Sequence, residues 1–240
     1  MEINAKHMTY RELNTQILNH PWNELVITGC CGQRYIANGF SGKKVEIFGT
    51  PGNALGAYLD SGEIYVHGDV QDAAGDTMND GTIYVDGMAG DAAGYAMRGG
   101  QIYIHSDVGY RCGIHMKAYG DKQPVMVIGG CAGSFLGEYQ AGGTIIVLGL
   151  NAKGKVPVGF FCGVGMHGGS IYLRTENLPK DLSDRITVKK ADAMDMEYIR
   201  PYLDTFCKKF GETPDNILAG SFYKLTPDSK NPYKQLYVAN

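Results

Sequence analysis

The stretch Gly81–His105, with the sequence GTIYVDGMAGDAAGYAMRGGQIYIH, decides the fold of this chain. It begins with a short run, Thr82–Asp86, in which apolar and polar residues alternate, and a similar run, Gln101–His105, follows 19 residues later. Gly87, Gly90 and Gly94 follow the first run at fixed offsets, and Gly99-Gly100 precede the second. A sequence that returns to one pattern at a fixed period is typical of a repeat protein, whose units stack on one another.

The repeat extends from about Val26 to Arg174 and comprises about seven copies. Its strand-like runs include Val26–Gly29, Val45–Gly49, Ile64–Gly68, Ile102–Ser106, Ile145–Gly149 and Ile171–Leu173. The period stretches in two places, by five residues near Tyr119–Gln123 and by seven near Asn151–Pro157. Insertions that leave the period intact elsewhere are typical of loops that project from a stacked array.

Each unit predicts one strand, because its apolar residues alternate with a period of two. A unit of 19 residues with one strand and glycine-rich corners cannot bury its apolar side alone, but it can do so when stacked on its neighbours. The sequence therefore predicts an all-β fold, a single-stranded right-handed parallel β-helix of about seven coils with short flanking α-helices. Four methionines should form one internal column: Met78, Met97, Met116 and Met166.

The pattern divides the chain into three regions. These are an N-terminal helical cap (1–24), the parallel β-helix (25–174) and a helical and extended segment that packs on it (175–240). Thr9 and Glu12 form the sequence signature of a capping box, and Pro21 limits the helix that follows. Asp192 and Gly211 bound a second amphipathic helix, with Gly211 as the C-terminal stop.

An apolar strip should run along the outer face of the strands. Its members are Tyr65, Tyr84, Tyr103, Val127, Ile146 and Tyr172, flanked by Phe48 and Leu148. A strip of this length is seldom left bare on a soluble protein. Either the C-terminal segment or another protein covers it, and the sequence favours the C-terminal segment. The aromatic end of the chain, with Tyr233, Leu236 and Tyr237, is also expected to pack.

Composition narrows the function classes. The net charge of −3 gives no basic footprint for nucleic acid, and no apolar run is long enough for a membrane span. The six cysteines contain no C-x-x-C pair, which speaks against a zinc or iron–sulfur site made by this chain alone. They are expected to be reduced and buried in a cytoplasmic protein.

Two nucleotide-binding motifs match only in part. Gly163–Gly168 fits G-x-G-x-x-G, but a strand follows where the dinucleotide fingerprint needs a helix. Gly149–Val156 approaches a P-loop, yet Val156 stands where a hydroxyl must reach magnesium. Both matches are interpreted as parts of the repeat and its loops.

One outward column carries candidate chemistry on three successive units: His67, Asp86 and His105. Neighbouring side chains of such a column lie about 5 Å apart, so a metal site or an acid–base pair is one interpretation. A ladder of exposed, compatible charges is the more usual one. An enzyme built on this column therefore stays the rival to a chain without an active site.

The glycine frame resembles the domain named GXGXG for its glycines. The offsets are complete in three copies: Gly49-Gly52-Gly56, Gly87-Gly90-Gly94 and Gly130-Gly133-Gly137; Gln71 and Ser106 depart from them singly. The GXGXG domain forms the C-terminal β-helix of the glutamate synthase large subunit, and a similar domain occurs in one of the subunits of formylmethanofuran dehydrogenase. The resemblance covers about residues 26–174.

This resemblance implies a structural body that links catalytic domains found elsewhere. In glutamate synthase the glutaminase nucleophile, the flavin and the iron–sulfur cluster belong to other domains, and Met1-Glu2 here lacks that nucleophile. No catalytic, cofactor-binding or metal-binding residue is therefore expected in this chain. FMN and an iron–sulfur cluster are expected in partner subunits, together with a glutaminase-type chain. Neither nucleic acid nor membrane is an expected partner, and a homo-oligomer stays open.

The C-terminal flank separates the two enzyme complexes. The stretch Phe222–Pro227 resembles the F-x-K-[VL]-x-P-type strand that closes glutamate synthase large subunits. This favours a non-catalytic glutamate synthase subunit, which supports glutamate formation from glutamine and 2-oxoglutarate by its partners. The alternatives are a component like the GXGXG-bearing subunit of formylmethanofuran dehydrogenase and a structural interaction module with no redox partner.

Overall fold

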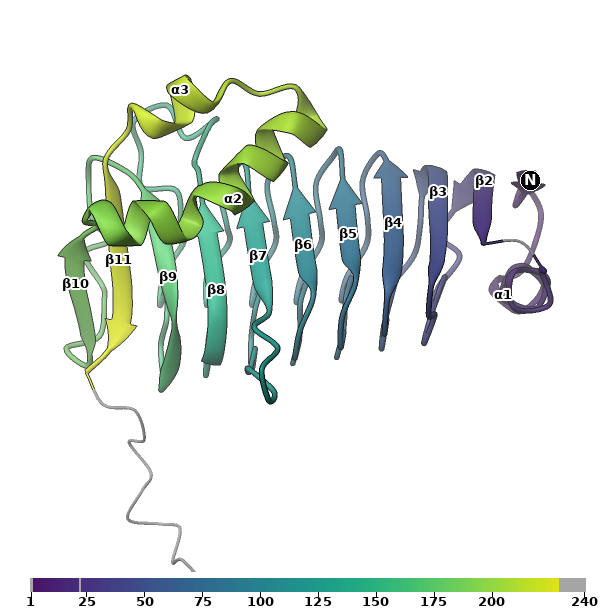
Figure 1. Cartoon of the computed structure of the whole chain (residues 1–240), viewed down its shortest axis with the longest axis horizontal. Coiled ribbons are helices and arrows are strands. Elements are labelled where there is room, and N and C mark those ends of the chain that lie inside the picture. The colour runs from purple at the N-terminus through teal and green to yellow at the C-terminus, as the bar shows by residue number, and fades with distance from the viewer. Residues whose placement is uncertain (1, 22, 229–240) are drawn as a thin grey trace, which may run out of the picture.

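The computed structural model describes residues 2–21 and 23–228, and their dominant element is one large, mostly parallel sheet (Figure 1). Within these residues the sheet has eleven strands in the order β1-β2-β3-β4-β5-β6-β7-β8-β9-β11-β10. The strands are β1 (Glu2–Asn4), β2 (Glu24–Cys31), β3 (Lys43–Thr50), β4 (Gly62–His67), β5 (Thr82–Val85), β6 (Gln101–Ile104), β7 (Val125–Ile128), β8 (Ala141–Val147), β9 (Gly168–Arg174), β10 (Ile186–Lys190) and β11 (Phe222–Pro227). The prediction of a β-rich fold with few short helices is confirmed.

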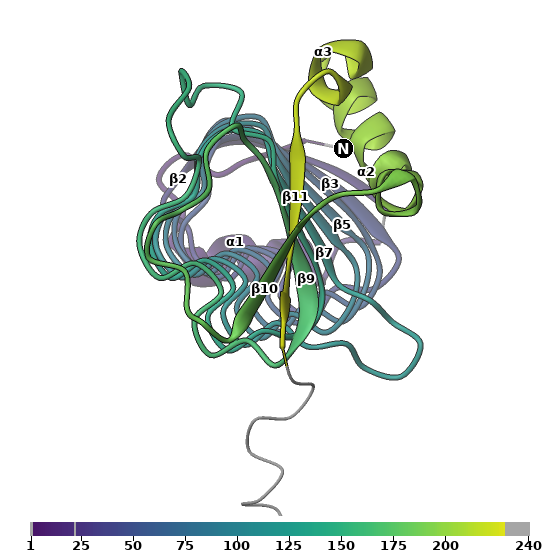
Figure 2. The ribbon, with the colours of Figure 1, turned by 90° about the vertical axis from the view of Figure 1, so that its left-hand side faces the viewer.

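The register follows the repeat residue by residue. Strands β1 to β9 pair in parallel in chain order, and Tyr65, Tyr84 and Tyr103 are direct partners on β4, β5 and β6. The segments between the strands also pair from one turn to the next, for example Val70 with Ala89 and Ala89 with Val108. Seen along the stack, these segments superpose into one closed outline (Figure 2). Because each turn repeats the hydrogen bonds of the last, residues at the same offset form columns.

The interior contains the apolar columns that the alternation predicted. Ile64, Ile83 and Ile102 are buried and paired through β4, β5 and β6. Met78, Met97, Met116 and Met166 are all buried at equivalent offsets, but the turn between Met116 and Met166 has Gln140 at this position, so the predicted methionine column is interrupted. Gly94 shows why glycine recurs at the corners: its φ is +69°, and a Cβ there would lie 2.4 Å from Cε of Met126.

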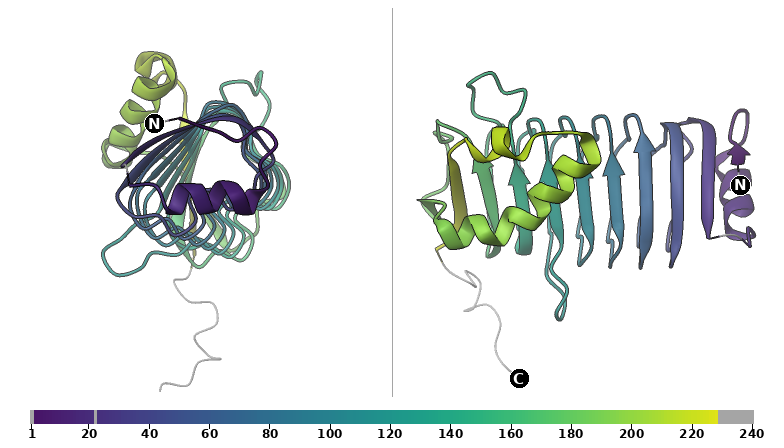
Figure 3. Two further views of the ribbon diagram at one scale, coloured as in Figure 1. Left: turned by 90° about the vertical axis from the view of Figure 1, so that its right-hand side faces the viewer. Right: turned by 45° about the horizontal axis from the view of Figure 1, so that its top comes forward.

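The N-terminal helix α1 (Tyr10–Leu18) lies across one end of the stack (Figure 3). Thr9 caps it, and the reciprocal bonds between Thr9 and Glu12 confirm the predicted capping box. Leu13 and Ile17 are buried on its inner face. The helix therefore shields the apolar interior at this end from water.

The C-terminal part contributes α2 (Ala193–Phe210), α3 (Pro214–Leu218) and the last two strands. Asp192 caps α2, and Gly211 ends it at a φ of +73°, as the sequence predicted. Strand β11 runs antiparallel between β9 and β10. The sequence analysis expected an extended segment here but did not identify β10. The predicted packing of Tyr233, Leu236 and Tyr237 lies outside the described residues.

Helix α2 covers the outer apolar strip over β6 to β9 (Figures 1 and 2). Ile199, Leu203 and Phe206 are buried against the strip. The strip residues under the helix are buried too: Tyr103, Val127, Ile146, Leu148 and Tyr172. At the other end of the strip Phe48 is 42% exposed. The chain thus provides its own cover for most of the strip, which was the favoured alternative.

The prediction for the cysteines was partly wrong. All six are free, and four of them are buried: Cys30, Cys112, Cys162 and Cys207. Cys31 is exposed because it alternates with buried Cys30 on β2, and Cys131 is half-buried. No helix in the described part of the chain is both long and apolar enough to cross a membrane.

Candidate functional site

The predicted column of His67, Asp86 and His105 lies where β4, β5 and β6 end, on the outer face of the sheet. His67 and Asp86 are brought together, with 3.3 Å between Nδ1 of His67 and Oδ2 of Asp86. His105 does not join them. Its Nε2 lies 3.0 Å from Oε1 of Glu212, and its ring stacks on Phe210 at 4.8 Å between centroids.

Other side chains complete the first half of this column. Oε1 of Glu46 lies 2.6 Å from Nε2 of His67, and the Tyr65 hydroxyl donates to Oδ1 of Asp86 at 2.8 Å. Burial and the hydrogen bond to Asp86 raise the pKa of Tyr65 to about 12. The imidazole is thus held between two carboxylates, as in an ion-paired ladder on a surface.

Glu46 and Glu212 were not predicted from the sequence. Glu46 pairs with Tyr65 rather than with His67 between β3 and β4, so aligning the repeats did not place it beside His67. Glu212 is 107 residues from His105 and follows α2, and no spacing signal connects them. No group of three or more His, Cys, Asp and Glu side chains among residues 2–21 and 23–228 is arranged to hold a metal ion.

A buried carboxylate joins α2 to the sheet. Asp195 is 6% exposed, and its Oδ1 accepts hydrogen bonds from Nζ of Lys224 at 2.6 Å and from the Tyr172 hydroxyl at 3.2 Å. Nζ of Lys189 lies 3.1 Å from its Oδ2. Burial by itself raises the pKa of Asp195, but the hydrogen bonds from Lys224, Lys189 and the backbone of Asp192 outweigh it and lower the pKa to about 2. This cluster fixes α2 in place.

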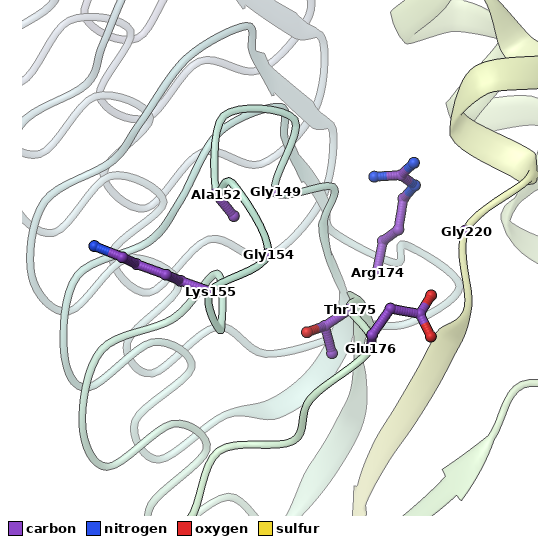
Figure 4. Close-up of a pocket in the computed structure, with 8 residues that line it drawn as sticks. All are labelled: Gly149, Ala152, Gly154, Lys155, Arg174, Thr175, Glu176 and Gly220. Carbon is purple, nitrogen blue, oxygen red and sulfur yellow. The ribbon is translucent and has the colours of Figure 1, made fainter.

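The P-loop-like stretch lines a cavity of about 180 Å³ (Figure 4). Gly149, Ala152, Gly154 and Lys155 face Arg174, Thr175, Glu176 and Gly220 across it. The guanidinium of Arg174 donates to the carbonyl oxygens of Leu148, Asn216 and Ile217. Arg174 therefore ties the α3 segment to the sheet, and the Lys155 side chain points away from it (Figure 4). This geometry agrees with the rejection of a phosphate-binding loop.

Aromatic rings gather at the corners of the later turns. We call this set the corner surface; Phe135 is half-buried and the other members are exposed: Tyr95, His115, Phe135, Tyr139, Phe160 and Phe161. His115 stacks on Tyr139 at 5.3 Å, and Phe135 stacks on Phe161 at 5.1 Å. Phe160 is 68% exposed and Tyr139 is 39% exposed. The ring contacts form two groups, one of Tyr95, His115 and Tyr139 and one of Phe135, Phe160 and Phe161. Groups of exposed rings are characteristic of interaction sites.

The backbone under the corner surface is strained. Phe135, Tyr139 and Phe161 have φ of +65°, +53° and +61°, where bulky side chains are rarely found. The corresponding residues of an earlier turn are alanines, Ala92 and Ala96. A left-handed residue other than glycine costs about 1–2 kcal/mol. Ala92 and Ala96 also have positive φ, at +55° and +49°, so the repeat imposes this backbone and the later turns differ only in the size and exposure of the side chains that it carries.

The corner surface was not recognised from the sequence, although a signal exists. Its residues recur at fixed offsets from the repeat glycines, where Ala92 is followed by Arg111, Phe135 and Phe161 in later copies. The change from small to large residues down one column marks the surface. Aromatic residues also return at the N-terminal end, where Tyr35 and Tyr58 have positive φ.

The glycine frame and the single, mostly parallel sheet agree with one family. The model of the family described as GXGXG motif matches residues 6–228, and the chain belongs to this family. It is 48% identical, over 98% of this chain and 95% of the relative, to the uncharacterized protein MJ1350 of Methanocaldococcus jannaschii.

A solved structure shares the fold. It is the crystal structure of the formyltransferase/hydrolase complex FhcABCD from Methylorubrum extorquens in complex with methylofuran. The TM-score is 0.62 at 21% identity, and the match covers 87% of this chain and 75% of the chain from the complex. The chain is therefore similar in fold to one chain of a multi-subunit complex.

Proposed function

We propose that this chain is a non-catalytic structural subunit that holds partner chains in a multi-chain complex. The observation that carries the proposal is the corner surface, where Phe135, Tyr139 and Phe161 present their rings from left-handed backbone positions. Tyr139, Phe160 and Phe161 leave much of their ring surface exposed to water, whereas an earlier turn has the small side chains of Ala92 and Ala96 at two of the same offsets. A partner that buries these exposed rings would account for them.

The comparisons support one type of complex better than the other. The likeness in fold to a chain of the formyltransferase/hydrolase complex favours a component like the GXGXG-bearing subunit of formylmethanofuran dehydrogenase. Nothing in the comparisons supports the glutamate synthase prediction, so it takes second place. It rests on the resemblance of the Phe222–Pro227 ending, and under it the partner chains would hold FMN and an iron–sulfur cluster.

We also propose a more specific description of the fold. A right-handed parallel β-helix of about seven coils accounts for the parallel order of β1 to β9 and for the closed outline of the turns. Residues 1–24 and 175–240 then serve as the helical cap and as the packing segment around the coils of 25–174. A circular dichroism spectrum dominated by helix would contradict this description.

Affinity co-purification from the native cell tests the function. The full chain carries a tag, and the wild type is compared with a Tyr139→Asn, Phe161→Asn double variant. Asparagine tolerates a positive φ, so these changes remove the rings without adding strain. Tyr58→Asn is the matched control, because Tyr58 is also an exposed tyrosine at positive φ (+56°) but lies outside the corner surface.

The wild type and the Tyr58→Asn control should retain the same partner chains, and the double variant should lose them. Recovery of subunits that handle formyl groups on methanofuran-type carriers supports the favoured complex. Recovery of a flavin and iron–sulfur protein with a glutaminase chain supports glutamate synthase instead. A wild-type chain that returns alone, or with equal partners in the double variant, contradicts the proposal.

A further inference from the structure

A groove of about 700 Å³ lies beside the corner surface. One wall is formed by the loop from Gly154 to Phe160 and the other by the segment from Asn177 to Asp181. Its apolar lining comes from five side chains: Val156, Val158, Phe160, Leu178 and Pro179. The ring of Phe160, the most exposed of the corner surface, thus belongs to both features. The volume is that of a site for a ligand or an inserted chain segment.

One wall of the groove is formed partly by residues that are inserted into the repeat. The seven-residue insertion near Asn151–Pro157 supplies Lys155 and Val156, while neighbouring turns stack without it. Stacking therefore does not require the insertion. Its effect on the surface is to raise a wall opposite Leu178 and Pro179.

The charges at the groove are mainly positive. Lys155 and Lys180 stand on opposite walls, are exposed, and form no ion pair with any of the described residues. Asp181 is the carboxylate of the lining, and its Oδ2 accepts a hydrogen bond from the backbone N–H of Phe161 at 2.6 Å. Lys153 adds a further exposed cation on the same loop. An apolar groove with a lysine on each wall complements a segment with apolar side chains and carboxylates.

We infer that this groove binds a segment of a partner chain that carries apolar side chains flanked by Asp or Glu. The inference rests on the proposed function and adds the chemistry of the contact. The last residues of this chain, 229–240, are a poor match, because they contain Lys230 and Lys234 and neither Asp nor Glu. Like charges would oppose their binding between Lys155 and Lys180.

Photo-cross-linking in the assembled complex tests the inference. A photoreactive phenylalanine analogue replaces Phe160 in the full-length tagged chain, the complex is purified and irradiated, and the cross-linked peptide is identified by mass spectrometry. The same analogue at Leu18, which is 64% exposed on α1, is the control position. The expected product at residue 160 is a partner peptide rich in apolar and acidic residues, absent from the control.

Charge reversal provides the second arm. A Lys155→Glu, Lys180→Glu variant should bind the purified partner at least tenfold more weakly at low salt, and added salt should reduce the difference. A Lys6→Glu, Lys208→Glu variant makes the same change in net charge at exposed lysines elsewhere and should bind like the wild type.

The outcomes separate this inference from the proposed function. Partners that remain bound after charge reversal, with cross-links to a basic peptide, to a second copy or to residues 229–240, overturn the groove and leave the structural role intact. A wild-type chain without any partner overturns both. An acidic, apolar partner peptide at residue 160 together with the tenfold loss establishes the groove.

Discussion

The face of the sheet under α2 and the corner surface are built from the same repeat, but the first is buried and the second is largely exposed. On the sheet, Tyr103 and Tyr172 lie under α2 and are buried. At the corners, Tyr139 and Phe160 belong to columns that no element of the described chain covers to the same extent. The chain thus covers one of the two surfaces by itself, and we propose that a partner covers the other.

The backbone shows the same contrast. The tyrosines under α2 lie on regular strands, where an aromatic residue is favoured. Phe135, Tyr139 and Phe161 instead occupy left-handed positions that favour glycine. We therefore expect substitutions in the covered face to lower the stability of the chain, and substitutions at the corners to weaken its binding to a partner.

The largest effect is expected for Phe206→Ala on the covered face. Phe206 is fully buried against the strip, with its ring edge-on to His105 at 6.0 Å. Removing such a ring costs about 3–5 kcal/mol in the free energy of unfolding, which urea denaturation measures. Phe161→Ala, at a half-exposed ring, should change it by about 1 kcal/mol or less. Equal losses at the two sites would remove the distinction between the regions.

Asp195→Asn is expected to lower the free energy of unfolding by about 2 kcal/mol at pH 7. The folded-state pKa of Asp195 is lowered from 3.8 to about 2, so its contribution is fully present above pH 4. The contribution is lost as the pH falls from about 4 through about 2, because the unfolded chain then binds the proton more readily. Urea denaturation at several pH values should show the variant and wild type converging in acid. A difference independent of pH would contradict the assignment.

A smaller effect on stability is expected from the asparagine variants of the corner surface. Tyr139→Asn and Phe161→Asn each lose a stacking contact but gain a residue that tolerates positive φ, so stability should stay within about 1 kcal/mol of the wild type. Thermal unfolding followed by circular dichroism measures this. A loss of more than about 2 kcal/mol would assign the rings to the stability of the isolated chain.

The smallest effect on stability is expected for Lys209, at the boundary between the part of the sheet that α2 covers and the part that it leaves exposed. Nζ of Lys209 lies 3.9 Å from the ring centroid of Tyr65 and 4.2 Å from that of Tyr84. Lys209→Ala should cost about 0.5–1 kcal/mol, as expected for partly exposed cation–π contacts. Lys209→Met, which keeps the apolar stem, should recover part of that loss. If both variants match the wild type, the last turn of α2 does not contribute to the cover.

The repeat made most of the fold predictable. The alternation and the glycine offsets give the strand register, because a column of tyrosines can form only when successive units pair in register. The caps at Thr9, Asp192 and Gly211 are local signals and were predicted correctly. Strand β10 was missed because its place in the sheet depends on β11, which arrives more than thirty residues later in the chain.

Less of the candidate site could be predicted from the sequence. The repeat frame placed His67 beside Asp86, but the partner of His105 comes from Glu212, beyond α2. A tertiary contact of this kind leaves no periodic signal in the sequence. The corner surface does leave one, but the backbone conformation at Phe135 and Tyr139, where φ is positive, cannot be read from the sequence.

Hydroxyl-radical footprinting of the isolated chain and of the purified native complex tests whether the corner surface holds the partner. The method measures the solvent accessibility of individual aromatic side chains. We expect strong protection of Tyr139, Phe160 and Phe161 in the complex and no change at Tyr58 or at the rings already buried under α2. Unchanged reactivity of the corner rings, with protection elsewhere, would contradict the claim that this surface holds the partner.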